Sequence, residues 1–245
     1  MIRALLSFLY FVLWLIFSIP AAKHAEKLGK SDPEKQQAFV NKKVNSCLKG
    51  MKFLAGTRVT CIGAENIPDT EPVLYVGNHR SLYDVLLTYP YLKGHAAYVG
   101  KKELEKTPLL GWWMKLTGCI FLDRDNVREA LKTILDGITL MKNGQSLFIF
   151  PEGTRNRGEE LSLLPFKEGS MKLALKSKSK IVPVSINNAA SIFEKQFPLI
   201  RRAHVVIEFG TPVDPQTLSR EQQTHLGETL RETIDTTLHN NASLV

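Results

Sequence analysis

The longest apolar run of the chain lies near its N-terminus. Residues 4–22, ALLSFLYFVLWLIFSIPAA, form 19 positions without a charge, and as a helix they would be roughly 28 Å long, about the hydrocarbon thickness of a bilayer. Aromatic and aliphatic side chains fall on every side of this helix, which favours insertion over lying flat on a surface. A cleaved signal peptide is the alternative, because small residues follow in SIPAAKHA.

Charge around this run predicts its orientation. Arg3 alone precedes it, whereas lysines crowd the far side at positions 23, 27, 30 and 35. Because positive residues favour the cytoplasmic side, we expect a retained anchor in the cytoplasmic (inner) membrane, with the rest of the protein on the cytoplasmic side.

A second helix is predicted after the polar turn SDPEKQQ, with Ser31 or Asp32 as its cap and Pro33 at its first position. Apolar residues then recur at helical spacing through Met51, and the polar positions include four lysines: Lys42, Lys43, Lys49 and Lys52. A basic amphipathic helix beside an anchor indicates anionic lipid headgroups. An ordinary surface helix with solvated lysines explains the pattern equally well.

Short β-rich runs alternate with helical patterns from Thr57 onward. The strand candidates are RVTCIG, PVLYVG, AAYVG, GCIFLD, SLFIF, IVPVSI and HVVIEFG, and the helical patterns lie at about 83–92, 103–116, 126–142, 168–178 and 219–238. This alternation predicts an α/β fold with a mixed, largely parallel sheet flanked by helices. We therefore expect N-terminal membrane-anchoring helices over residues 1–54 and an α/β domain over 55–245, with its sites at the carboxyl ends of strands.

Composition narrows the class of partner. The chain carries 32 Lys and Arg against 24 Asp and Glu, a net charge of +8, which predicts an anionic partner such as nucleic acid, an acidic membrane or a phosphorylated substrate. Nucleic acid is the least favoured, because the basic residues are scattered and no reader motif is present. The three cysteines, Cys47, Cys61 and Cys119, form no CxxC pair, which suits a reducing compartment and argues against structural zinc.

The segment NHRSLYD, residues 78–84, follows the apolar run PVLYVG. On a continuous helix, residues five apart diverge by about 140°, so His79 and Asp84 meet only if His79 lies in the turn and Asp84 in the first turn of the next helix. The carboxylate would then accept the Nδ1 proton and leave Nε2 free as a base. Ser81 to Asp84 also matches a helix capping box, and the two interpretations are compatible.

Two further strand ends carry arginines. After SLFIF comes PEGTRNRG, where Gly153 lets backbone amides approach a ligand and Arg155 can grip a phosphate with its planar fork. A surface turn with a solvated arginine is the alternative. Arg124, flanked by Asp123 and Asp125, would on its own indicate a structural ion pair.

Together these stretches resemble the 1-acyl-glycerol-3-phosphate acyltransferase family of the bacterial PlsC type. Four motifs appear in the family's order: H-x4-D at His79 and Asp84, G-x5-R at Gly118 and Arg124, E-G-T-R at residues 152–155, and the proline-bearing VPVSI at residues 182–186. The segments VGKKEL (99–104) and PFKEGS (165–170) also resemble family segments. The resemblance covers about residues 57–210, with no departure at a key position.

By that resemblance, His79 deprotonates the free hydroxyl of lysophosphatidic acid and Asp84 stabilises the resulting imidazolium. The resemblance also implies acyl-CoA or acyl-acyl carrier protein as donor, phosphatidic acid as the product in phospholipid biosynthesis, membrane lipids as partners, and neither a cofactor nor a metal. The substrate-binding residues that it implies are Arg155, Glu152, Gly153, Thr154, Arg124 and Lys101. Two acyl chains need an apolar groove open to the bilayer. PLLGWWM, residues 108–114, is expected to line this groove or to anchor at the membrane interface, where tryptophan is favoured; packing in the core is the alternative.

Two other classes of function fit the sequence less well. A membrane-bound lipid hydrolase needs a nucleophile or a metal, and the chain has neither a G-x-S-x-G elbow nor a ligand cluster. A non-catalytic module that binds anionic lipid explains the charge and the anchor but gives no reason for His79 and Asp84. Within the family, glycerol-3-phosphate or another lysophospholipid is the alternative acceptor.

Overall fold

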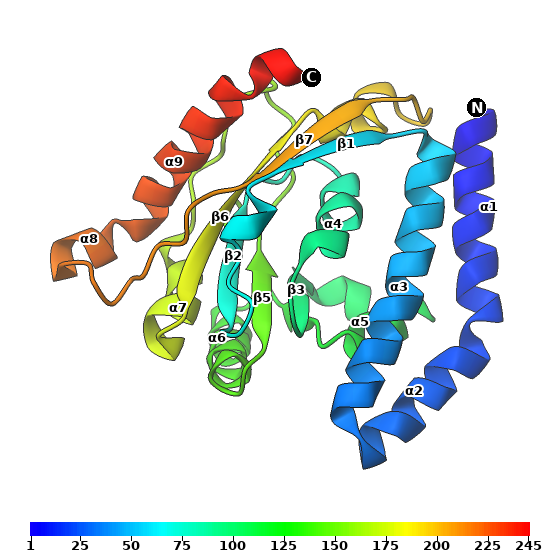
Figure 1. Cartoon of the computed structure of the whole chain (residues 1–245), viewed down its shortest axis with the longest axis horizontal. Coiled ribbons are helices and arrows are strands. Elements are labelled where there is room, and N and C mark those ends of the chain that lie inside the picture. Colours follow the sequence, from blue (N-terminus) through cyan, green and yellow to red (C-terminus); the bar gives the residue numbers. More distant parts are fainter.

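A seven-stranded sheet forms the centre of the computed structural model, which describes residues 1–245 (Figure 1). Its strands lie in the order β1-β7-β6-β2-β5-β3-β4. Every neighbouring pair is parallel except β6 and β7, which run antiparallel. The predicted mixed, largely parallel sheet is therefore confirmed. Its strands are β1 (Arg58–Ile62), β2 (Val73–Gly77), β3 (Ala96–Lys101), β4 (Ile120–Leu122), β5 (Ser146–Ile149), β6 (Lys180–Asn187) and β7 (His204–Phe209).

Helices cover both faces of this sheet, and side chains of the central strand β2 pack in the hydrophobic core on each face. Tyr75 packs in the core that includes Leu87 of the helix α4, whereas Leu74 and Val76 pack in the core shared with α6, α7 and α9. Successive strand residues point to opposite faces, so a strand covered on both faces is apolar throughout. The helices of this part are α4 (Tyr83–Thr88), α5 (Leu110–Leu116), α6 (Val127–Lys142), α7 (Lys172–Ser177), α8 (Arg220–Thr224) and α9 (Leu226–Asn240).

Three N-terminal helices pack beside the sheet: α1 (Ile2–Phe17), α2 (Ile19–Ser31) and α3 (Pro33–Ala55) (Figure 1). The helix α3 begins as predicted, with Pro33 first and the Asp32 side chain accepting a hydrogen bond from the Lys35 amide at 3.0 Å. Its residues Val44 and Leu48 pack against the core that contains Tyr75. The third helix thus joins the N-terminal segment to the α/β body.

The expected unbroken helix over residues 4–22 is wrong, because the chain bends at Ser18. No single helix is both long and apolar enough to cross a membrane, and α1 and α2 meet that requirement only as a pair bent by 49°. Pro20 lies in the first turn of α2, where its missing N–H and its ring are incompatible with continuing the preceding helix. Ser18 Oγ accepts a hydrogen bond from Trp113 Nε1 at 2.8 Å and donates one to the Leu15 carbonyl at 3.0 Å.

The segment PLLGWWM therefore packs against the N-terminal helices. Trp113 is buried, and its ring centroid lies 5.0 Å from that of Trp14. Trp112 Nε1 donates to Glu26 at 2.8 Å. Core packing is therefore what the structure shows for Trp113.

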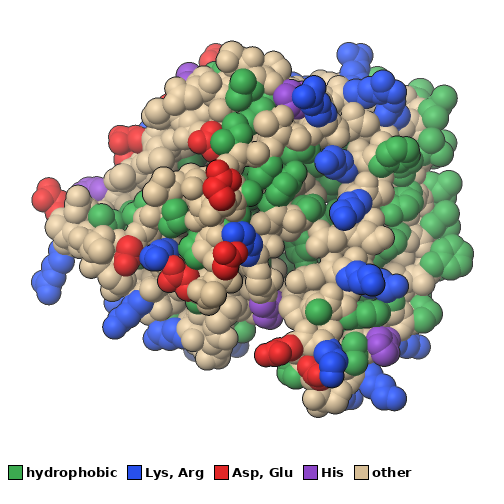
Figure 2. All heavy atoms as spheres, viewed as in Figure 1, with side chains coloured by type: hydrophobic (Ala, Val, Ile, Leu, Met, Phe, Trp, Pro, Cys, Tyr) green, Lys and Arg blue, Asp and Glu red, His purple; other side chains and the backbone are tan.

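The outer face of α1 is apolar and exposed. Figure 2 shows hydrophobic side chains gathered along the edge of the molecule where Figure 1 places α1. Phe8 is 68% exposed and Leu5 66%. An apolar surface of this kind is typical of a face that contacts a membrane or a protein.

Candidate active site

The carboxyl ends of β2 and β5 lie side by side, since these strands are parallel neighbours at the middle of the sheet. From β2 the chain crosses to β3 on one side, and from β5 it crosses over β2 to β6 on the other. Such a reversal leaves a crevice beyond the strand ends, where α/β proteins bind ligands. His79 follows β2, and Glu152 follows β5.

His79 and Asp84 are in direct contact. Nδ1 of His79 lies 2.8 Å from Oδ2 of Asp84, which is in the first turn of α4 and almost fully buried. The turn into a helix thus brings the two side chains together, as their spacing predicted. No protein group hydrogen-bonds His79 Nε2, so the arrangement can accept a proton there from a bound molecule.

The same oxygen of Asp84 accepts two further hydrogen bonds, from the amides of Arg80 at 2.7 Å and Ser81 at 2.8 Å. Ser81 Oγ in turn accepts a hydrogen bond from the Tyr83 amide at 3.0 Å. Only half of the predicted capping box is therefore present: Asp84 accepts the Ser81 amide, but the Asp84 amide donates to the Ser81 carbonyl instead of Oγ, and α4 starts after Leu82 without a side-chain cap.

Phe150 fixes the plane of the imidazole. Its ring stacks on that of His79 with centroids 4.1 Å apart and an interplanar angle of 16°. The motifs did not predict this contact, although Phe150 directly precedes the PEGTR turn and so lies at the same sheet edge. Stacking on one side and Asp84 at Nδ1 together leave the imidazole little freedom.

Glu152 supports His79 through the backbone rather than lying open to a ligand. Its Oε1 accepts the His79 amide at 2.6 Å and its Oε2 accepts the Leu164 amide at 3.0 Å. Burial raises the pKa of this carboxyl, while the two amide hydrogen bonds oppose that rise. Glu152 therefore ties the turn after β2 to the turn after β5.

Arg80 holds the neighbouring loop. Its guanidinium is 5% exposed and donates to the carbonyls of Glu159 at 2.8 Å and Gly158 at 2.7 Å. The turn that presents His79 thus also organises the loop beyond Arg155.

The predicted phosphate-binding residues do not converge on a single point. Arg155 pairs with Glu194 at 3.1 Å, and Lys101 pairs with Glu103 at 2.7 Å on the surface. Thr154 is exposed in the turn. Arg124 instead lines a small cavity beside Gly153 and Phe150, where burial lowers the pKa of its guanidinium.

Lys167, in the PFKEGS segment, lines the same cavity as Arg124. Neither cation forms an ion pair in the structure. Gly153 has a φ of +74°, and a Cβ there would lie 3.0 Å from Lys167 Nζ. Glycine at 153 therefore serves both the turn and the space that Lys167 occupies.

The chain is similar to known proteins over most of its length. Residues 58–187 match the acyltransferase family. A 1-acyl-sn-glycerol-3-phosphate acyltransferase of Borreliella burgdorferi is 32% identical over 191 residues, which cover 78% of this chain and 76% of that protein. The chain belongs to the acyltransferase family.

Other relatives indicate the same family. A 1-acyl-sn-glycerol-3-phosphate acyltransferase of Saccharomyces cerevisiae is 32% identical over 77% of this chain, which spans 62% of the yeast protein. The crystal structure of the 1-acyl-sn-glycerophosphate acyltransferase PlsC from Thermotoga maritima superposes with a TM-score of 0.81 and 28% identity, covering 98% of this chain and 96% of that one. The family resemblance read from the motifs is confirmed.

Glu194 lies outside the segment matched to the acyltransferase family, yet it contacts the site directly. It belongs to a short 3-10 helix, Glu194–Gln196, in the connection after β6. Its carboxylate accepts Ser81 Oγ at 2.6 Å, the Leu82 amide at 2.8 Å and Arg155 Nη1 at 3.1 Å. Glu194 therefore joins the start of α4, which carries Asp84, to the arginine of the E-G-T-R motif.

Replacing Glu194 with Gln removes the ion pair but keeps one oxygen acceptor. Because the pair is partly exposed, we expect a loss of up to about 1 kcal/mol, roughly fivefold in kcat/KM for acyl transfer. If Glu194 acts through Arg155, the substitution adds nothing in an Arg155→Gln background. Steady-state kinetics of the four proteins measure this coupling.

Glu228→Gln is the matched control, because Glu228 also pairs with an arginine, Arg231, but on α9. We expect it to leave kcat/KM unchanged. Additive losses in the double variant, or an equal loss from Glu228→Gln, would contradict a role for Glu194 in holding Arg155.

Proposed function

We propose that this acyltransferase transfers an acyl chain from acyl-CoA or acyl-acyl carrier protein to the free hydroxyl of 1-acyl-glycerol-3-phosphate, forming phosphatidic acid for phospholipid biosynthesis. The observation that carries the proposal is the His79–Asp84 contact at 2.8 Å in the crevice beyond β2 and β5. Similarity to the 1-acyl-sn-glycerol-3-phosphate acyltransferases of yeast and Borreliella and to the 1-acyl-sn-glycerophosphate acyltransferase of Thermotoga supports this acceptor.

In the proposed reaction, Nε2 of His79 removes the proton of the acceptor hydroxyl, and the oxygen attacks the thioester carbonyl. Asp84, hydrogen-bonded to Nδ1, stabilises the imidazolium that forms. The new C–O bond replaces the C–S bond, and the thiolate leaves with the proton that His79 returns. No covalent acyl-enzyme is required.

Two separate groups of cations suit two phosphate-bearing substrates. Arg155 uses one nitrogen for Glu194 and keeps its other donors for the acceptor phosphate, next to the backbone of Gly153. Arg124 and Lys167 line a cavity that Gly153 also lines, and Lys101 adds positive charge at the end of β3.

We also propose that the protein acts at the cytoplasmic face of the inner membrane. The exposed apolar face of α1 supports this location. The α1–α2 bend at Ser18 favours a bent pair of helices that enters the bilayer, rather than one straight helix that spans it. Both proposed substrates are amphiphiles, so a site beside the bilayer receives them without extracting an acyl chain into water.

His79→Ala should reduce acyl transfer by about 10²–10⁴-fold, because the general base is lost. Asp84→Asn should also be severely impaired, since it keeps the shape but loses the charge that stabilises imidazolium. The assay uses labelled acyl-CoA with a panel of lysolipid acceptors and glycerol-3-phosphate. The compound that the wild-type protein acylates fastest is its acceptor.

The control for this test is His239→Ala, since His239 lies 3.6 Å from Asp235 in an exposed histidine–aspartate pair. It should keep full activity, and all variants should still bind vesicles. Wild-type turnover in His79→Ala would refute the base, and vesicle binding with no transfer by the wild type would favour a lipid-binding module.

Arg155→Ala should weaken use of the acceptor far more than binding of acyl-CoA. Loss of a charge-assisted hydrogen bond costs about 1.5–3 kcal/mol, on the order of ten- to a hundred-fold. Arg155→Lys should recover only part, because an ammonium cannot make a bidentate contact. Acceptor and donor titrations measure this, with Arg157→Ala as the exposed-arginine control; a defect confined to acyl-CoA would reassign Arg155 to the donor.

Leu5→Glu with Phe8→Glu should release much of the protein from membranes, because two charges then occupy the apolar face of α1. Sedimentation of membrane fractions measures the change, and Val127→Glu with Leu131→Glu on α6 is the control, since those apolar residues are also exposed. Mass spectrometry should find an intact N-terminus. Cleavage near Ala22 would instead identify a signal peptide.

A further inference from the structure

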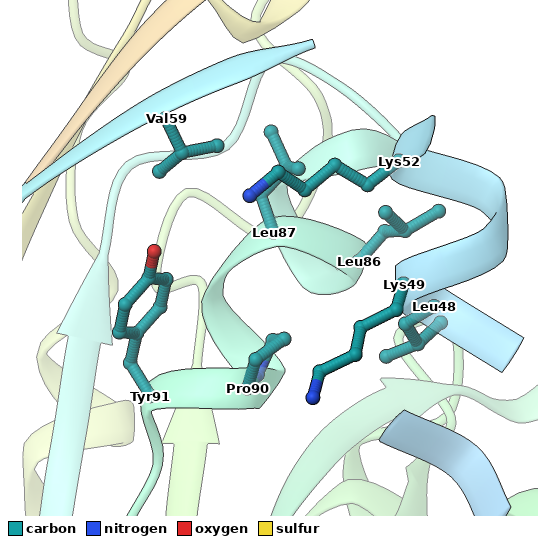
Figure 3. A pocket seen from close by; sticks show the side chains of 8 residues that line it. All are labelled: Leu48, Lys49, Lys52, Val59, Leu86, Leu87, Pro90 and Tyr91. Carbon is teal, nitrogen blue, oxygen red and sulfur yellow. The ribbon is translucent and has the colours of Figure 1, made fainter. Parts of the chain in front are cut away.

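A cavity of about 240 Å³ lies between α3, β1 and the end of α4 (Figure 3). Its apolar walls come from Leu48, Val59, Leu86, Leu87, Pro90 and Tyr91. Neither His79 nor Asp84 lines it, and none of the motif residues does. The proposed acyl-transfer chemistry therefore leaves this cavity without a use.

Two lysines complete the lining of this cavity. Lys49 and Lys52 are three positions apart on α3, so they lie on one side of the helix. Figure 3 shows both side chains reaching from α3 over the apolar walls, with the Lys49 ammonium beside Pro90. Neither ammonium forms an ion pair in the structure.

This combination is complementary to an amphiphile with an anionic head. An alkyl chain against the six apolar residues leaves water, which is favourable, while a phosphate near two unpaired ammoniums gains charge-assisted hydrogen bonds. A free phosphate would leave the apolar walls unused, and a neutral lipid would leave the two lysines unused. One ligand class, an anionic phospholipid, uses both.

The cavity is also within reach of the bilayer proposed above. The helix α3, which supplies both lysines, packs against α1. Figure 2 shows a row of Lys and Arg side chains beside the hydrophobic edge formed by α1. Phe53, next to Lys52, is 81% exposed, so apolar surface continues along α3 outside the cavity.

We propose that this cavity binds one anionic phospholipid of the bilayer, with its phosphate between Lys49 and Lys52 and part of one acyl chain against Leu86, Leu87 and Val59. The bound lipid would touch α4, a helix of six residues whose second residue is Asp84. The proposal rests on contact with a membrane and not on the acyl-transfer reaction.

The test is native mass spectrometry of the full chain in detergent, with phosphatidylglycerol as the probe and phosphatidylcholine as the neutral comparison. We expect the wild type to retain one phosphatidylglycerol and little phosphatidylcholine. Lys49→Gln with Lys52→Gln should weaken retention roughly tenfold or more. Val59→Phe should weaken it as well by filling the cavity, with the melting temperature checked for each variant.

The matched control is Lys42→Gln with Lys43→Gln, which makes the same change of charge on the same helix outside the cavity. It should retain phosphatidylglycerol, and so should Arg155→Ala, whose change lies at the candidate active site. Equal weakening in the Lys42 and Lys43 variant would mean diffuse attraction only. That result would overturn the proposal. Equal retention of phosphatidylcholine by the wild type, or full retention of phosphatidylglycerol by the Lys49 and Lys52 variant, would overturn it as well.

Discussion

One oxygen atom, Oδ2 of Asp84, holds the candidate active site together. It accepts hydrogen bonds from the His79 ring and from the amides of Arg80 and Ser81. Those amides belong to the first residues after the central strand, which would otherwise be free to adopt several turns. The same contacts that close the turn therefore also hold this carboxylate against the imidazole.

The sheet gives this turn a fixed base. β2 is bonded on both sides, to β5 and β6, and all five of its residues are buried. Glu152 then links the ends of β2 and β5 through two amides. The core therefore determines the positions of the strand, the turn and the stacking ring. The surface loops are left to provide the charge that substrates bind.

Local patterns were enough to predict much of this arrangement. The contact between His79 and Asp84 follows from five-residue spacing across a strand end, and the seven strands follow from short apolar runs between turn residues. The cap of α3 at Asp32 likewise follows from the Asp-Pro pair. In each case the residues that carry the pattern lie close together in the sequence.

Contacts between distant segments could not be predicted in this way. Glu194 is 112 residues from Leu82 and carries no motif, so only the fold brings it to Arg155. The bend at Ser18 depends partly on Trp113, 95 residues away, and an apolar run by itself predicts a straight helix. The family motifs pointed to Arg155, Arg124 and Lys101 as one set, whereas their positions depend on which carboxylates lie nearby.

The buried guanidinium of Arg80 helps to offset the conformational entropy that the adjoining loop loses when it becomes ordered. Ordering a residue's backbone costs roughly 1–2 kcal/mol, and the segment RGEELS, residues 157–162, has a single large apolar side chain with which to offset that cost. Arg80 offsets part of this cost by donating hydrogen bonds to the carbonyls of Gly158 and Glu159. One buried cation therefore ties the polar loop to the histidine turn, and we expect the two segments to gain and lose order together.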